Sequence, residues 1–134
     1  MSNLNFFFAP RSVAVIGASS TPGKPGRTVI ENLIANKFKG RIVPVNPAGG
    51  KICGLTVIKS TDALPTNIDM GIVMLPAQNA PQIILECAAK NIKTIVLAAS
   101  GFAEVDQLGK DLQAELKSVI SRTGVRVLGP NTAG

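Results

Sequence analysis

Short apolar runs recur along the chain, and each of them stops at a glycine, a proline or a polar turn. The runs are rich in β-branched side chains, a composition typical of strands that are buried on both faces. They cover residues 13–16, 42–45, 70–75, 94–98 and 125–128. A shorter extended piece is expected at 51–53, after a glycine turn.

Between these runs lie segments with apolar residues at helical spacing, which predict helices over 26–38, 79–90 and 103–122. Pro81 falls in the first turn of the second helix, where a missing N–H costs little. Alternating strands and helices form a parallel sheet, because right-handed crossovers put helices on each side. We therefore expect a Rossmann-like α/β fold, doubly wound, with a mainly parallel sheet of five to six strands and helices on both faces.

The 134 residues fit one domain, residues 1–134. Because the chain stops just past its last predicted strand, we expect an N-terminal fragment of a longer, multidomain protein. No apolar stretch is long enough to cross a membrane, and the first residues lack the pattern of a secretory signal, so we expect a cytoplasmic protein without a membrane partner. Cys53 and Cys87 have no C-x-x-C spacing and are expected to be free thiols.

Positive charge is concentrated in the first part of the chain. Residues 1–60 hold eight Lys and Arg against the single acid Glu31, whereas residues 61–134 hold six basic and seven acidic residues. Attraction for anions is therefore expected in the first half. A nucleic-acid partner is not expected, because the basic residues show no recognition-helix pattern and no aromatic interleaving.

The composition also limits the chemistry. Histidine is absent, which removes imidazole bases, Ser-His and Cys-His pairs and His metal ligands. Tryptophan and tyrosine are absent too, so the chain offers few platforms for stacking bases. We expect no catalytic residue and no metal site in this chain, and whatever reaction involves it must be largely supplied from outside.

The loop after the first predicted strand is the best candidate for a ligand site. Ligands of such sheets bind beyond the carboxyl ends of the strands, and the N-terminus of the following helix offers free N–H groups with partial positive charge. Small and hydroxylated residues also form ordinary turns, but this loop is the first strand-to-helix turn, and the basic half of the chain surrounds it. Lys24 and Arg27 could neutralise phosphate directly. The loop residues expected to bind phosphate are Gly17, Ala18, Ser19, Ser20, Thr21, Pro22 and Lys24.

Two familiar phosphate motifs do not fit this loop. A dinucleotide site needs G-x-G-x-x-G and an acid at the end of the second strand, but the glycines are Gly17, Gly23 and Gly26, and the second strand ends at Asn46 with no acid nearby. A P-loop is excluded, because Lys24 is followed by proline. An NAD(P)-binding Rossmann domain is thus a less favoured alternative.

Five short motifs follow one another at the predicted strand ends. They are P-R-S-V-A-V-I-G-A-S at 10–19, V-P-V-N-P at 43–47, L-P-A at 75–77, S-G-F-A-E at 100–104 and L-G-P-N at 128–131. In this order they resemble the coenzyme A-binding domain of the NDP-forming acyl-CoA synthetases, the family of the ADP-forming acetyl-CoA synthetases and of the N-terminal domain of the succinyl-CoA synthetase alpha subunit. The resemblance covers essentially the whole chain.

The resemblance implies that Ser19 to Pro22 wrap the phosphates of coenzyme A, bound as CoA or acyl-CoA. The other implied contacts are Val45, Asn46 and Pro47 at the adenosine end, Pro76, Ala77, Ala99, Ser100 and Gly101 along the pantetheine arm, and Asn131 near the thiol. Two departures are visible. The family often has a lysine directly after Asn-Pro, where this chain has Ala48-Gly49-Gly50 and then Lys51, and Thr132 stands where the family has cysteine.

The resemblance also implies partners. In the full enzymes an acyl phosphate forms and a histidine of a later domain is phosphorylated before coenzyme A attacks the acyl group, while an ATP-grasp domain or subunit binds the nucleotide. Since this chain contains neither part, it is expected to be inactive alone. Related domains are also fused to protein lysine acetyltransferases, where they sense acyl-CoA. The sequence leaves these two parents open, together with the acyl group and the choice of ADP or GDP.

Overall fold

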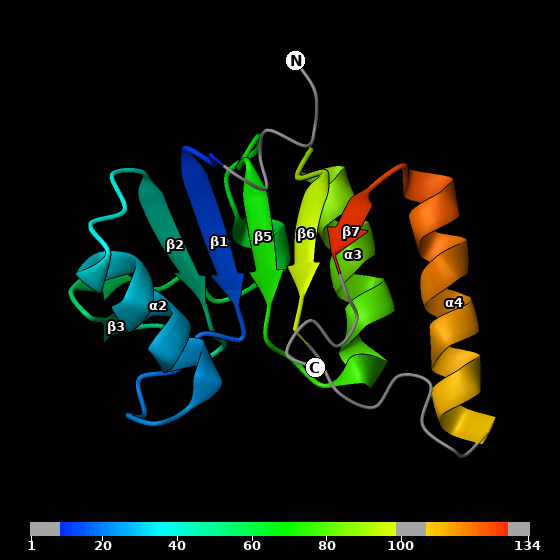
Figure 1. Cartoon of the computed structure of the whole chain (residues 1–134), viewed down its shortest axis with the longest axis horizontal. Helices are drawn as coiled ribbons and strands as arrows, with labels where there is room; N and C mark the ends of the chain where they lie inside the picture. The colour runs from blue at the N-terminus through cyan, green and yellow to red at the C-terminus, as the bar shows by residue number, and fades with distance from the viewer. Residues whose placement is uncertain (1–8, 99–106, 129–134) are drawn as a thin grey trace.

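The computed structural model describes residues 9–98 and 107–128, which form a parallel sheet with helices on both faces (Figure 1). Five strands pair in the order β2-β1-β5-β6-β7, and every pairing between them is parallel. Their bounds are Ser12–Ile16 for β1, Arg41–Val45 for β2, Met70–Val73 for β5, Thr94–Leu97 for β6 and Arg126–Leu128 for β7. Since β1 lies between β2 and β5, the connections from β1 and β5 leave the sheet in opposite directions, which is where such folds bind ligands.

Three helices connect these strands, namely α2 (Pro25–Ala35), α3 (Ala80–Ala89) and α4 (Gln107–Thr123). Side chains alternate between the two faces of a strand. Accordingly Val13 and Val15 of β1 pack in one cluster with Ile30 of α2, whereas Ala14 and Ile16 belong to the cluster that contains α3 and α4. The expected doubly wound α/β fold is confirmed.

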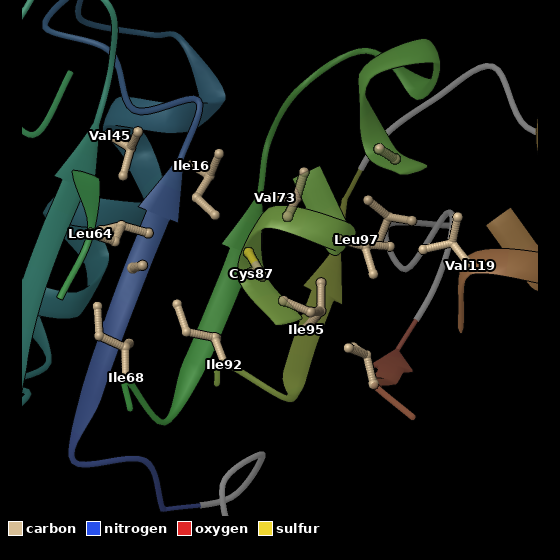
Figure 2. Packing of buried hydrophobic residues seen from close by; sticks show 14 of the residues in the cluster. Ile16, Val45, Leu64, Ile68, Val73, Cys87, Ile92, Ile95, Leu97 and Val119 are labelled. Carbon is tan, nitrogen blue, oxygen red and sulfur yellow. The ribbon is translucent and has the colours of Figure 1, made fainter. Parts of the chain in front are cut away.

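The larger cluster fills the space between the sheet and α3. Figure 2 shows Val73, Ile95 and Leu97 of the sheet gathered around α3, with Cys87 among them. All four of these side chains are inaccessible to solvent. Burying such side chains is the main favourable term in folding, so this cluster fixes how α3 sits on the sheet.

The helix predicted over 26–38 ends three residues early, at Ala35. Asn36 is the C-cap, and Lys37 adopts a φ of 58°. The amide of Lys37 then donates to the carbonyl of Ile34, and the amide of Phe38 donates to that of Leu33. This is the Schellman pattern, which turns the chain out of the helix. Phe38 still packs beneath α2, so its apolar character misleadingly suggested a longer helix.

The extended piece predicted at 51–53 is half of a hairpin. β3 (Lys51–Ile52) pairs antiparallel with β4 (Leu55–Thr56), a strand that the sequence did not suggest. Cys53 and Gly54 connect them with φ angles of 50° and 80°. Positive φ at both central residues is the mark of a tight hairpin turn, for which Asn-Gly is the usual signal. Because cysteine is not the usual residue at the first of these two positions, the sequence did not predict the hairpin.

The other predicted boundaries agree closely with the structure. A 3₁₀ turn, η2 (Ala77–Asn79), precedes α3, and Pro81 lies in the first turn of α3 as expected. A second 3₁₀ turn, η1 (Thr61–Ala63), precedes β5. Of the long helix predicted over 103–122, residues 103–106 lie outside the described residues. None of the helices in the described parts of the chain has the length and apolar character needed to span a membrane.

Candidate functional site

The turn after β1 is possible only with glycine at two positions. Gly17 has a φ of +94°, and a Cβ added to it would lie 2.5 Å from the carbonyl oxygen of Met74. A Cβ on Gly26, in the first turn of α2, would overlap the carbonyl oxygen of Gly17. These two glycines bring the N-terminus of α2 directly against the end of β1. No acidic residue lies in the first turn of α2, and no side chain caps it. The helix dipole places partial positive charge at this end, where Pro25 has no N–H and the amides of Arg27 and Thr28 donate to the carbonyl of Lys24.

The turns after β1 and β2 are joined by hydrogen bonds. The carbonyl of Val45 accepts from the amides of Gly17 and Ala18, at 3.2 and 3.1 Å. The side-chain amide of Asn46 donates to the carbonyl of Ala18 at 2.7 Å, and its Oδ1 accepts from the amide of Ala48 at 2.7 Å. Asn46 therefore holds the two turns in a fixed relative position.

The rest of the first loop projects into solvent. Ser19 is half-buried, whereas residues 20–24 are exposed. The hydroxyl of Ser19 accepts from the amide of Thr21 at 3.0 Å, which closes a small turn. Arg27 donates to the carbonyl of Ser20 at 2.6 Å and also pairs with Glu31 at 3.2 Å. The loop is therefore supported by its own helix.

A cavity of about 480 Å³ opens at the carboxyl ends of β1 and β2, on the side of the sheet that α3 covers. It is lined by residues 16–19, 45–47 and 59–61, and by Leu75, Asn79, Ile83 and Glu86. Backbone and small side chains form one wall, and the first residues of the α3 connection form the other. Its volume and its place at the β1/β5 crossover are those of a site for a small organic ligand or cofactor.

Comparison with known proteins identifies the family. The CoA binding domain family matches residues 11–134, which is most of the chain. This chain belongs to the CoA binding domain family. The resemblance drawn from the strand-end motifs is thereby confirmed.

The relatives of this CoA-binding domain are larger proteins. It is 42% identical over 132 residues to ADP-forming acetate–CoA ligase II of Archaeoglobus fulgidus, covering 98% of this chain and 20% of the ligase. It is 40% identical over 136 residues to the alpha subunit of ADP-forming acetate–CoA ligase I of Pyrococcus furiosus, covering 98% of this chain and 29% of the subunit. The chain thus spans less than a third of either relative.

A solved structure of a relative has the same fold. The dinucleotide-forming acetyl-coenzyme A synthetase 1 of Ca. Korarchaeum cryptofilum, in complex with phosphate and ADP, matches with a TM-score of 0.88 at 34% identity, over 97% of this chain and 28% of that one. The CoA-binding domain therefore has the α/β fold of the ADP-forming synthetases.

The cavity brings together six of the residues that the sequence suggested for the CoA-binding domain, namely Gly17, Ala18, Ser19, Val45, Asn46 and Pro47. Ser20, Thr21, Pro22 and Lys24 do not line it and lie on the exposed loop beside it. Pro76 is exposed and Ala77 is buried, both directly after the lining residue Leu75. The remaining suggestions lie outside the described residues; they are Ala99, Ser100, Gly101 and Asn131.

Several lining residues were missed from the sequence. Asn79, Ile83 and Glu86 come from one side of the α3 connection, with the three- and four-residue spacing of a helix face. Ile83 was recognised only as an apolar helix position. Lys59 was missed because nothing in the local sequence says that residue 58 pairs with the end of β2. That pairing is a bridge between Ile58 and Val45.

The charge around the cavity is smaller than the sequence suggested. Not all of the basic residues lie near the first loop. Arg11 precedes β1 and Arg41 begins β2, so both lie at the amino-terminal ends of these strands, away from the loop. Arg27 is engaged by Ser20 and Glu31. The charged side chains that line the cavity are Lys59 and Glu86, and no ion pair joins these two.

Neither cysteine contributes a nucleophile to the cavity lining. Cys87 is buried in the core under α3, and burial, followed by the negative charge of Glu86, raises the pKa of its thiol to about 12. Cys53 is exposed in the β3–β4 turn and does not line the cavity. Across residues 9–98 and 107–128, no three His, Cys, Asp or Glu side chains are grouped to hold a metal ion.

Proposed function

We propose that the cavity at the ends of β1 and β2 binds coenzyme A, as CoA or acyl-CoA. The observation that carries the proposal is the cavity itself, about 480 Å³ in volume, walled by the Gly17 turn and by the Asn46 turn. Gly17 packs closely on the carbonyl of Met74, which shapes this wall, and the adjoining helix N-terminus carries no acid. Such a surface fits a pyrophosphate.

The chain's own residues would bind and orient the ligand. The turn at Ser19 to Pro22, next to the positive end of α2, would hold the phosphates, and Val45, Asn46 and Pro47 would lie beside the adenosine. Pro76 and Ala77, with Ala99 to Gly101, would lie along the pantetheine, and Asn131 near the thiol. Coenzyme A supplies the thiol that becomes acylated.

We propose further that this is one domain of a longer ADP-forming acid–CoA ligase, which makes acyl-CoA and ADP and phosphate from an acid, ATP and CoA, reversibly. Support comes from the ligases reported above, each more than three times the length of the matched part. With no histidine in its 134 residues, the chain would depend on another domain or subunit for a phosphohistidine and for nucleotide binding.

Its two free cysteines, Cys53 and Cys87, suit a reducing compartment, and we assign the protein to the cytoplasm.

Isothermal titration of the chain with CoA and with NAD tests the binding proposal. We expect CoA to bind more tightly than NAD, since the end of β2 offers no acid for a ribose. Asn79→Trp fills the cavity and should abolish CoA binding. Its neighbour Gln78 is exposed and does not line the cavity, so Gln78→Trp is the matched control and should bind normally. Tighter binding of NAD, or full CoA binding by Asn79→Trp, would refute the proposal.

A further inference from the structure

Lys59 is the one positive charge that lines the cavity within the described residues. We infer that its ammonium group binds a second phosphate of the ligand, a monoester separate from the pyrophosphate, and so makes the site prefer CoA over dephospho-CoA. This inference rests on the proposed function and names the part of the ligand that the cavity selects.

The backbone holds Lys59 at the sheet edge by pairing with the end of β2. The amide of Ile58 donates to the carbonyl of Pro44 at 2.8 Å, and the amide of Asn46 donates to the carbonyl of Ile58 at 2.9 Å. Ile58 thus bridges to Val45 in parallel register. Since Val45 and Asn46 also line the cavity, this pairing delivers the next residue, Lys59, to its rim.

The stem of Lys59 lies across the turn that follows Asn46. A Cβ added to Gly49 would lie 2.9 Å from Cε of Lys59 and 3.3 Å from its Cγ, so the stem occupies the place that a larger residue at 49 would need. Gly49 in turn donates to the carbonyl of Asn46 at 3.0 Å, which closes the turn. A lysine held along its stem loses less conformational entropy when its ammonium group binds a ligand.

The ammonium group of Lys59 is free to bind a ligand. Within the described part of the chain, Lys59 makes no ion pair and no side-chain hydrogen bond, in contrast to Arg27. Glu86 lines the same cavity and would repel an anion placed near it. A phosphate is therefore favoured on the Lys59 side.

A single pyrophosphate would leave Lys59 without a role. Under the proposed function the pyrophosphate lies at the turn from Gly17 to Ser19, on the β1 side of the cavity. Lys59 is attached instead through the turn after β2, which is where the adenosine would lie under the proposed function. Coenzyme A differs from dephospho-CoA by one phosphate monoester on that ribose. The placement of the lysine matches this difference.

The test is titration of the chain and its variants with CoA and with dephospho-CoA at low ionic strength. We expect the wild type to bind CoA about tenfold more tightly, the effect of one hydrogen bond to a charged group. Lys59→Met should lose this preference through weaker CoA binding and leave dephospho-CoA binding unchanged. Lys51→Met is the matched control, because Lys51 is exposed on β3, does not line the cavity and should not matter. Lys59→Arg should retain the preference.

The outcomes separate the inference from the proposed function. If the wild type binds neither ligand, the proposed function fails and the inference fails with it. If the wild type binds both and Lys59→Met keeps the preference for CoA, or weakens both ligands equally, the inference alone is overturned. Thermal unfolding of each variant checks that the chain is folded, and Lys59 is exposed, so its replacement should leave the melting temperature unchanged.

Discussion

Asn46 at the end of β2 donates its side-chain amide to the carbonyl oxygen of Ala18, 28 residues earlier and just past the end of β1. The same side chain accepts from the amide of Ala48. An asparagine that follows a strand and precedes a proline is readily interpreted as a ligand contact. Here its amide is already engaged with the protein, so its first role is to hold two turns together at the mouth of the cavity.

We therefore predict that Asn46→Ala reduces stability as well as binding. Removing the side chain leaves the carbonyl of the buried Ala18 without this donor, and the cost should be about 1–2 kcal/mol in the free energy of unfolding. Urea denaturation followed by circular dichroism measures it. Asn32→Ala is a suitable control, since Asn32 is exposed on α2 and its replacement should change stability by less than about 0.5 kcal/mol. Equal stability of the two variants would contradict the role assigned to Asn46.

Gly17 and Gly23 give a second matched pair. Both have a positive φ, +94° and +88°, so alanine is strained at either position, by about 1–2 kcal/mol. Only at Gly17 would the new Cβ also meet backbone, the carbonyl of Met74, whereas nothing lies within 4 Å of a Cβ at Gly23.

Gly17→Ala should thus lose more stability than Gly23→Ala and should also abolish CoA binding. Denaturation curves and CoA titration of both variants measure the two effects. If the two variants were equally stable and both bound CoA, close packing of the Gly17 turn against β5 would not be what shapes the site.

The sequence was sufficient to predict the sheet because the central strands are short apolar runs, each with a clear stop. Val13 to Ile16 illustrates this, since all four side chains are buried and alternate between the two faces of the sheet. The parallel sheet with helices on both faces followed from general rules on crossovers. The Gly17 to Ser19 and Asn46 to Pro47 parts of the site could be predicted for the same reason, because they directly follow strands.

The unpredicted parts depend on contacts between distant residues. The β3–β4 hairpin turns through Cys53 and Gly54, and cysteine is not a usual signal for a positive φ. Lys59 reaches the cavity through the bridge from Ile58 to Val45, and no local pattern encodes that bridge. Arg27, a candidate phosphate ligand from its position, donates to Ser20 and Glu31 within its own loop and helix.

Asp69 directly precedes β5, at the end of the sheet away from the cavity, and leads to a prediction about stability. Its carboxylate is nearly buried, accepts from the amide of Arg11 at 2.7 Å and lies 3.5 Å from the Arg11 Nε. Asp69→Ala removes this acceptor, so it should cost about 1–3 kcal/mol of stability. CoA affinity should be unchanged, because β1 and β5 separate Asp69 from the cavity. Asp62→Ala, at an exposed position in η1, is the control and should alter neither quantity.

The two cysteines should react at very different rates. Cys53 is exposed, whereas Cys87 is buried with a pKa of about 12, so almost no thiolate forms there near neutral pH. At pH 8 a thiol reagent such as a disulfide-exchange dye should label one thiol rapidly, and Cys53→Ser should remove that fast phase. The second thiol should react only as the chain unfolds. Two fast thiols in the native protein would contradict the burial of Cys87.

The same thiol predicts how stability depends on pH. The pKa of Cys87 is raised from 9.0 to about 12 in the folded chain, so the folded state keeps its proton where the unfolded state has lost it. The stabilisation is full below pH 9 and is lost as the pH rises from 9 towards 12, since ionisation of the unfolded chain favours unfolding. Urea denaturation at pH 8 and pH 10.5 measures this loss. Cys87→Ala is less stable throughout because it leaves a cavity, but its stability should fall less steeply with pH, and an identical slope for wild type and variant would refute the prediction.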